Sequence, residues 1–321
     1  MSDISRRDLV VSASGAAVLG LCGPMAVIPD ALAQTKLKQG FVNYDIGDVR
    51  CTSLYDGIWK KPHDANFIRN ASLDDMKSAL KQGGLTTEFM PIEFSQTVLK
   101  VGKKTVLVDS GTGGQLSPDA GMMMKNLKAA GVEAKSIDTI LISHFHPDHI
   151  FGLMAKGTNE QIFPNAEIMM PSKEYKFWTD PSIVSKLPKR FQGLALRIQA
   201  TFPKWKNVTL FDEGEQQLLP GVRSIPAYGH TPGHTAFHVS SGDKQLIIAG
   251  DAANLPALFL KNPNWHLVFD GDPKAAQEAR VKLFNRVLEE KAVVAGYHFG
   301  FPNAGKLEKD GKGFAFSAFT G

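Results

Sequence analysis

Cysteine is nearly absent from this chain, and its scarcity limits the chemistry to expect. The 321 residues include two cysteines, Cys22 and Cys51. Cys22 lies in an N-terminal stretch that we expect to be removed, so we predict no internal disulfide in the remaining chain. A metal site built on thiolates needs several cysteines and is not expected either.

Runs of one charge and long hydrophobic runs are also missing. The net charge of +4 is spread without a basic run, which argues against a nucleic-acid partner. Charged residues at 21% and hydrophobic residues at 43% exclude a disordered polyampholyte and provide for a large core. No stretch is long and apolar enough to span a bilayer, so we predict no stable membrane anchor.

The N-terminus has the pattern of an export signal. Arg6-Arg7 precedes a mildly apolar stretch from Leu9 to Ile28, and Ala31-Leu32-Ala33 forms a small-x-small cleavage site. The Ser-Arg-Arg-Asp-Leu order resembles a twin-arginine signal, which exports folded proteins. We predict a signal peptide at 1–33, a domain at 34–321 and a periplasmic or secreted location. The alternative is a retained N-terminal helix.

Strand and helix patterns recur in both halves of the remaining chain. A hairpin is predicted at 93–111 with its turn at Gly102, and 137–143 is a continuous apolar strand expected to be buried on both faces. Helical periodicity runs over 71–84 and 273–291. This pattern of strands and helices predicts one α/β domain. Two sheet layers would pack face to face with helices outside, and ligand groups would lie on loops at the shared edge of the sheets.

A six-residue cluster, His144-Phe145-His146-Pro147-Asp148-His149, directly follows the buried strand. Alternate residues of an extended segment share a face, so His144 and His146 can point to one side. Asp148 and His149 follow where the chain turns into a helix, and they can point to a neighbouring position. Neutral imidazoles and carboxylates suit zinc and similar divalent ions. The cluster therefore predicts ligands for two adjacent metal ions rather than a histidine-rich surface loop.

Three more candidate ligands each follow an apolar strand beside a glycine. They are His230 in "GHTPGH", Asp251 in "IIAGD" and His298 in "AGYHFG". A buried aspartate needs a counter-charge, which metal ions would provide. Each residue alone also fits a core or turn position, but together with the first cluster the three predict one shared site.

The pattern His144-x-His146-x-Asp148-His149, followed by His230, Asp251 and His298, resembles the metallo-β-lactamase superfamily. The segments "VLVDSGTGG", "FPNAEI" and "GHTPGHT" further resemble its methyl parathion hydrolase branch and the related lactonases. The resemblance covers nearly all of the chain after the signal. It implies a four-layer αββα sandwich of two mixed β-sheets, with a dinuclear site at its edge.

The resemblance also implies a role for each candidate. One metal ion would be held by His144, His146 and His230. The other would be held by Asp148, His149 and His298, and Asp251 would bridge both ions. Three further histidines, His63, His238 and His266, match no ligand position, and we expect them to be structural or at the surface.

Two residues outside the ligand set also belong to the implied site. Asp109 would steady the site without binding metal, and His234 would pack nearby. Asp148 and Asp251 are the candidate catalytic residues. Asp148 would orient the hydroxide or pass its proton to the leaving group.

Two divalent ions that share a water make it hydroxide near neutral pH and polarise a substrate oxygen. The leading hypothesis is therefore an exported dinuclear hydrolase in which a metal-bridging hydroxide cleaves neutral esters. These would be lactones, such as acyl-homoserine lactones, or organophosphate triesters. Zinc is the expected metal, with manganese, cobalt or iron as alternatives. The other enzyme readings are a β-lactamase, a glyoxalase II-like thioesterase and a mononuclear persulfide dioxygenase. A non-catalytic metal-binding protein is the alternative of another class.

The surroundings of the motifs favour a neutral small-molecule substrate over a polyanion, because no Arg/Lys cluster flanks them. Leu116, Phe145 and Trp178 are candidate substrate-binding residues, with ordinary core packing as the alternative for each. The long aromatic segment 254–273 is a candidate lid, pocket wall or dimer contact. The sequence leaves open whether the chain forms a homodimer.

Overall fold

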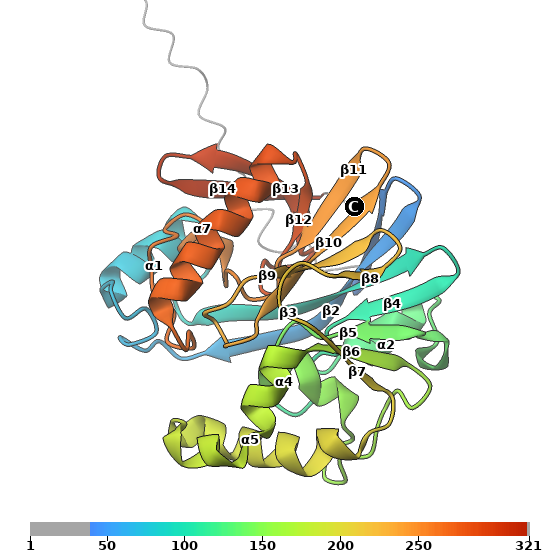
Figure 1. Ribbon diagram of the computed structural model, residues 1–321. Helices are drawn as coiled ribbons and strands as arrows, with labels where there is room; N and C mark the ends of the chain where they lie inside the picture. Colours follow the sequence, from blue (N-terminus) through green and yellow to red (C-terminus); the bar gives the residue numbers. More distant parts are fainter. Residues whose placement is uncertain (1–38, 320–321) are drawn as a thin grey trace, which may run out of the picture. The chain divides into compact units, whose positions relative to one another are not determined.

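The computed structural model describes residues 39–319, so the expected signal peptide at 1–33 lies outside the described residues. In the described chain, two seven-stranded sheets pack face to face and helices cover their outer faces (Figure 1). The predicted αββα arrangement of two mixed sheets is confirmed. No helix within residues 39–319 is long and apolar enough to cross a membrane.

The first sheet is antiparallel from β1 to β4 and parallel from β4 to β7. Its strands, in spatial order, are β1 Phe41–Ile46, β2 Val49–Lys61, β3 Met90–Val101, β4 Lys104–Val108, β5 Thr139–Leu141, β6 Glu167–Pro171 and β7 Val208–Phe211. The predicted hairpin is the pair β3 and β4, and Gly102 has φ +58° at its turn.

The second sheet is antiparallel except where β11 pairs with β12 in parallel. Its strands, in spatial order, are β14 Gly313–Ala318, β13 Ala304–Asp310, β12 Val293–Ala295, β11 Lys244–Ile248, β10 Thr235–Ser241, β9 Val222–Pro226 and β8 Gln217–Leu219. The hairpin of β13 and β14 was not predicted from the sequence.

The helices form two outer layers. They are α1 Leu73–Gln82, α2 Met123–Ala129, α3 Pro147–Ile150, α4 Ser172–Thr179, α5 Lys189–Thr201, α6 Pro256–Phe259 and α7 Pro273–Glu289. Residues of α2 to α5 pack on the first sheet, and residues of α1, α6 and α7 pack on the second. Helix α1 begins with the predicted cap, because Ser72 and Asp75 form a capping box, and it ends at Gly83.

Strand β5 shows how the layers fix the position of the site. Ile140 belongs to the core between the first sheet and its helices, whereas Leu141 belongs to the core between the two sheets. Both side chains have no exposed surface, as expected for a parallel strand covered on both faces. The strand is therefore held on both sides just before the chain reaches His144.

Candidate metal centre

Four of the candidate ligands lie at the junction of strand β5 and helix α3. His144 and His146 lie in the loop after β5. His146 has φ −69° and ψ 153°, the extended conformation favoured before a proline, and Pro147 begins α3. Asp148 and His149 therefore lie in the first turn of α3, beside the two loop histidines.

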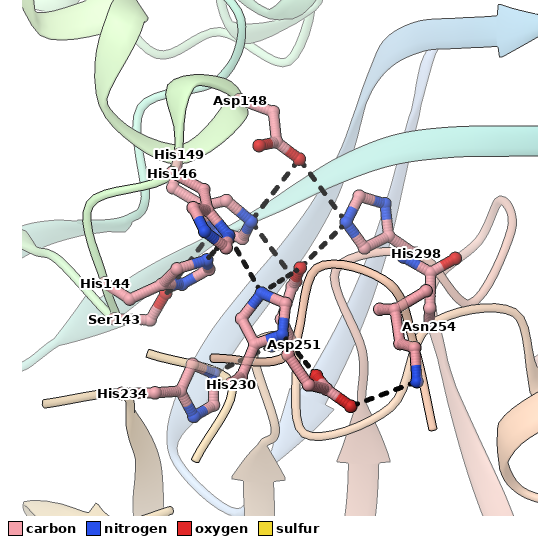
Figure 2. A network of polar contacts seen from close by, with 12 residues as sticks. Ser143, His144, His146, Asp148, His149, His230, His234, Asp251, Asn254 and His298 are labelled. Carbon is pink, nitrogen blue, oxygen red and sulfur yellow. Dashed lines mark hydrogen bonds and ion pairs between the residues drawn. The ribbon is translucent and has the colours of Figure 1, made fainter. Parts of the chain in front are cut away.

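The other three candidates follow strands of the second sheet. His230 lies between β9 and β10, Asp251 follows β11, and His298 follows β12. Gly250 has φ +53°, and a Cβ there would lie 2.8 Å from Nε2 of His234. Only glycine allows this close approach just before Asp251. Figure 2 shows the side chains of both loop groups pointing toward one another.

Three ring nitrogens and one carboxylate converge at the first candidate metal position. Nδ1 of His146 lies 3.1 Å from Nε2 of His144 and 2.9 Å from Nε2 of His230. Oδ2 of Asp251 lies 3.3 Å from the same His230 nitrogen. Imidazole nitrogens that present lone pairs to one another repel, so their convergence suits a shared cation.

A second group lies directly beside the first. Oδ2 of Asp148 lies 3.5 Å from Nε2 of His149 and 3.4 Å from Nε2 of His298. Asp251 reaches the same nitrogens, with Oδ1 at 3.2 Å from His149 and Oδ2 at 3.1 Å from His298. One ligand atom from each member of a group lies within 4.8 Å of the others, and Asp251 belongs to both groups.

Hydrogen bonds on the far side of the rings orient four of the histidines. Nδ1 of His149 and of His230 each lie 2.8 Å from a carboxylate, of Asp109 and Asp270 respectively. Nδ1 of His298 lies 2.8 Å from the carbonyl of Glu93, and Nδ1 of His144 lies 3.0 Å from Oγ of Ser143. A proton on Nδ1 satisfies these contacts and leaves the lone pair on Nε2, which faces the site.

Burial and charge shift the pKa values within the site in opposite directions. Burial and the neighbouring histidines lower the pKa of His144 and His146. Burial also opposes charge on His230 and His298, but the carboxylates near each outweigh it and raise their pKa to about 9 and about 10. Nearby imidazoles outweigh the burial of Asp251 and hold its pKa well below the usual value. The carboxylates thus attract positive charge into a buried site.

The residues present fit two divalent ions. Nε2 of His149 and Oδ1 of Asp251 are buried and form no hydrogen bond within residues 39–319. Orphaned buried polar atoms are costly, and both face the shared centre of the site. Nitrogen and carboxylate donors, arranged in two groups that share one carboxylate, match the donor preference of zinc-like ions.

Residues 95–298 match the family model of the metallo-beta-lactamase superfamily. The match spans more than half of the chain and includes all seven candidate ligands. The chain belongs to the metallo-β-lactamase superfamily. No curated protein sequence matches the chain significantly.

Several solved structures resemble this chain along most of its length. AidC, a dizinc quorum-quenching lactonase, is 26% identical with a TM-score of 0.78, and the match covers 88% of this chain and 98% of AidC. The hydrolase AbOPH is 27% identical with a TM-score of 0.80 and the same coverage. A probable metal-dependent hydrolase from Staphylococcus aureus is 21% identical, with a TM-score of 0.71 over 86% of this chain and 99% of that one, and it shows the fold alone.

Asp109 lies beside the candidate ligands, with both carboxylate oxygens engaged. Oδ1 accepts the backbone N–H of Ser143, and Oδ2 accepts the hydroxyl of Ser143 and faces His149. Asp109 has φ +58°, a conformation that a non-glycine residue adopts only when its surroundings hold it there. The metal-binding and catalytic roles assigned to individual residues stay predictions.

The candidate substrate residues lie in different surroundings. Leu116 is 41% exposed, but Phe145 has no exposed surface and packs against Phe202 and Tyr175 in the core. Trp178 is 2% exposed. Neither Phe145 nor Trp178 therefore offers a surface to a substrate in this structure. Both side chains are packed in the core, which was the alternative to a substrate-binding role.

Phe191 of α5 was not singled out from the sequence, yet it lies against the site. Its ring stacks on the ring of His146 with centroids 5.3 Å apart and an interplanar angle of 9°. The ring of Trp178 lies beside both, with its centroid 6.2 Å from that of Phe191 and 6.4 Å from that of His146. An aromatic face therefore adjoins the first metal position.

Segment 254–273 is firmly attached to the second half of the chain. The buried guanidinium of Arg280 donates to the carbonyls of Ala252, Pro263 and Trp265. Leu258, Phe259 and Leu267 of this segment are buried in the core. The contacts favour a fixed wall over a movable lid. The segment also supplies Asp270, the unpredicted partner of His230.

Proposed function

We propose that the chain is a dinuclear metal-dependent hydrolase of neutral esters, with lactones as the leading substrate class and organophosphate triesters as the second. The observation that carries the proposal is the position of Asp251, whose carboxylate belongs to both ligand groups. One carboxylate shared by two adjacent groups is the arrangement expected for a pair of ions that act together. A purely structural zinc site is normally closed and mononuclear.

When bound, two divalent ions acidify a water molecule and polarise the ester oxygen, so no side-chain nucleophile is required. The residues of the chain would hold the two ions, orient the ligand side chains and shield the site from solvent. His144, His146 and His230 would hold the first ion, and Asp148, His149 and His298 the second. Zinc is the metal we propose, because imidazole nitrogen and carboxylate oxygen are its usual donors where cysteine is lacking.

Asp148 is suited to move a proton. Its Oδ2 faces His149 and His298, whereas its Oδ1 forms no hydrogen bond to any residue in 39–319. The side chain is 15% exposed, compared with 5% for Asp251. The free oxygen can therefore accept a proton from the nucleophile and donate it to the leaving alkoxide.

The surroundings of the site support an uncharged substrate with an apolar group. The ring of Phe191 covers one side of His146, and an apolar face of this kind favours an acyl chain or an aryl group. AidC, which resembles this chain over 88% of its length, is a dizinc lactonase. This similarity favours a lactone over a β-lactam or a thioester.

The test is a substrate panel on purified protein whose metal content has been counted. The panel holds an acyl-homoserine lactone, an aryl ester, an organophosphate triester, a cephalosporin and lactoylglutathione. We expect two ions per chain and turnover of the lactone or the triester that stops on chelation. Turnover of only the cephalosporin or the thioester, or ester hydrolysis that survives complete metal removal, would reject the proposal.

We also propose that the protein is exported, on the strength of Arg6-Arg7 and the cleavage site ending at Ala33. The test is cell fractionation of the full chain beside the variant Arg6→Lys/Arg7→Lys. We expect the unaltered protein outside the cytoplasm, shortened by about 33 residues, as a signal peptide of this kind predicts. The variant should stay in the cytoplasm at full length, and equal export of both would contradict the proposal.

A further inference from the structure

A buried glutamate outside the ligand set connects two of the ligand loops. Glu174 in the first turn of α4 has no exposed surface. Its Oε1 accepts the backbone N–H of Phe145 at 3.0 Å and the indole N–H of Trp178 at 2.7 Å, and its Oε2 accepts the backbone N–H of Gly233 at 2.8 Å. No lysine, arginine or histidine within residues 39–319 forms an ion pair with it.

The two backbone donors belong to the two loops that form the first candidate metal position. We call it the three-histidine position, after His144, His146 and His230. Phe145 lies between His144 and His146 in the chain, and Gly233 lies three residues after His230. One carboxylate thus bonds the loop of the first sheet through one oxygen and the loop of the second sheet through the other. Charge-assisted bonds from backbone N–H groups to a carboxylate are the stronger kind.

Close packing supports the same connection. A Cβ on Gly233 would lie 2.3 Å from the backbone nitrogen of Glu174 and 2.7 Å from its Cα. The loop that carries His230 therefore rests directly on the first turn of α4, and only glycine permits this contact. The Glu174 carboxylate connects both loops to α4, and the close packing at Gly233 independently fixes the distance of the His230 loop from that helix.

We propose that Glu174 is a positioning residue that sets the spacing between the His144–His146 pair and His230, and so the metal affinity of the three-histidine position. The inference rests on the proposed function, since it concerns the metal pair that the hydrolase would use. The other ligand group takes Asp148 and His149 from α3 and His298 from the second sheet, and Glu174 contacts none of these residues within hydrogen-bonding distance.

The substitution Glu174→Gln separates the two connections. The amide oxygen can still accept from Phe145 and Trp178, but the amide nitrogen would then face the N–H of Gly233, donor against donor. The variant therefore releases the His230 loop while it keeps the His144 loop. Trp178→Phe is the matched control, because it removes the indole donor and leaves both loop contacts in place.

Background substitutions allow each metal position to be measured alone. In His298→Ala the three-histidine position keeps all its ligands and the other position loses one. In His146→Ala the three-histidine position loses one ligand and the other position keeps all of its own. Cobalt binding to the full chain, followed by absorption and by competition with a chelator, gives an affinity in each background. The readout is metal binding rather than turnover, so absent ester hydrolysis would reject the proposed function without deciding this test.

We expect Glu174→Gln to weaken cobalt binding about 10- to 100-fold in the His298→Ala background, the usual effect of losing a supporting partner of a metal ligand. Binding in the His146→Ala background and binding by Trp178→Phe should change little. Unchanged affinity in the first background, or an equal loss in both, would overturn the proposal. Where Glu174→Gln fails to fold, Gly233→Ala applies the same test, because it pushes the His230 loop away from α4 and should weaken only the three-histidine position.

Discussion

The backbone N–H of Asp251 donates to Nε2 of His234 at 2.9 Å, and Nδ1 of the same ring lies 2.9 Å from the carbonyl of Ala227. The ring therefore carries its proton on Nδ1. Burial, together with the nearby charge of His230, lowers the pKa of His234 to about 3, so the ring stays neutral. A histidine outside both ligand groups thus fixes the main chain at the carboxylate that the two groups share.

His234→Ala would leave the N–H of Asp251 buried without an acceptor. We expect a loss of about 1–3 kcal/mol in the free energy of unfolding of the metal-free protein, the usual cost of such an orphan. Because Asp251 belongs to both groups, both ions should bind more weakly. Denaturant unfolding and metal titration test this, with His63→Ala, the variant of a half-buried histidine outside both ligand groups, as the control. Selective loss of one ion would contradict it.

Asp270 supports His230 from the far side of its ring. Asp270→Asn keeps the size of the side chain, but its amide can offer an N–H to the Nδ1–H of His230 and so disfavour the required tautomer. We expect the affinity of the three-histidine position to fall about 10- to 100-fold, measured in the His298→Ala background. Asp272→Asn, at the cap of α7, is the control. Equal affinities of the two variants would show that Asp270 does not set the tautomer.

Most of the fold could be predicted because the residue pattern of a single strand shows which of its faces are buried. Ile140 and Leu141 are apolar neighbours that face opposite cores, and a strand with no polar face has to be covered on both sides. The hairpin of β13 and β14 was missed although its signal is present. The two-residue loop between the strands is Gly311-Lys312, because Asp310 pairs with Gly313, and Gly311 has φ +56° at a turn position that favours glycine.

The candidate ligands were identifiable because they lie in short motifs, but their supporting partners were not. Asp270 is 40 residues from His230, and Glu174 is 59 residues from Gly233. Nothing local distinguishes these carboxylates from solvated ones, because their burial depends on how α4 and segment 254–273 pack. Phe145 was predictable in principle. It alternates with His144 and His146, so the rule that points the histidines into the site points Phe145 into the core.

Phe191 offers a test of the substrate class. Phe191→Ala removes the aromatic face beside His146 and leaves every candidate ligand in place. We expect kcat/KM for a long-chain lactone or an aryl triester to fall roughly 10-fold or more, the effect of one buried aromatic side chain, and short-chain lactones to be affected less. Steady-state kinetics on a chain-length series measure this. Leu196→Ala, an exposed position on the same helix, is the control. An equal loss for all chain lengths would argue against an apolar subsite at Phe191.

Glu93 predicts a specific pH dependence of stability. Burial raises the pKa of its carboxyl to about 7, against a smaller opposing effect from the N–H of Phe301. The folded protein therefore favours the protonated form, whereas the unfolded chain ionises near its ordinary value. The stabilisation is complete below that value, about 4.3, and is lost as the pH rises through about 7.

Glu93→Gln cannot titrate, so the comparison with the unaltered protein isolates this effect. We expect the free energy of unfolding of the variant, relative to that of the unaltered protein, to rise by about 1–3 kcal/mol between pH 4 and pH 8. Urea unfolding of both metal-free proteins at several pH values measures the difference, because the titration of the remaining groups cancels between them. A difference that stays constant with pH would show that folding does not raise the pKa of the Glu93 carboxyl, and a difference that falls would show that folding lowers it.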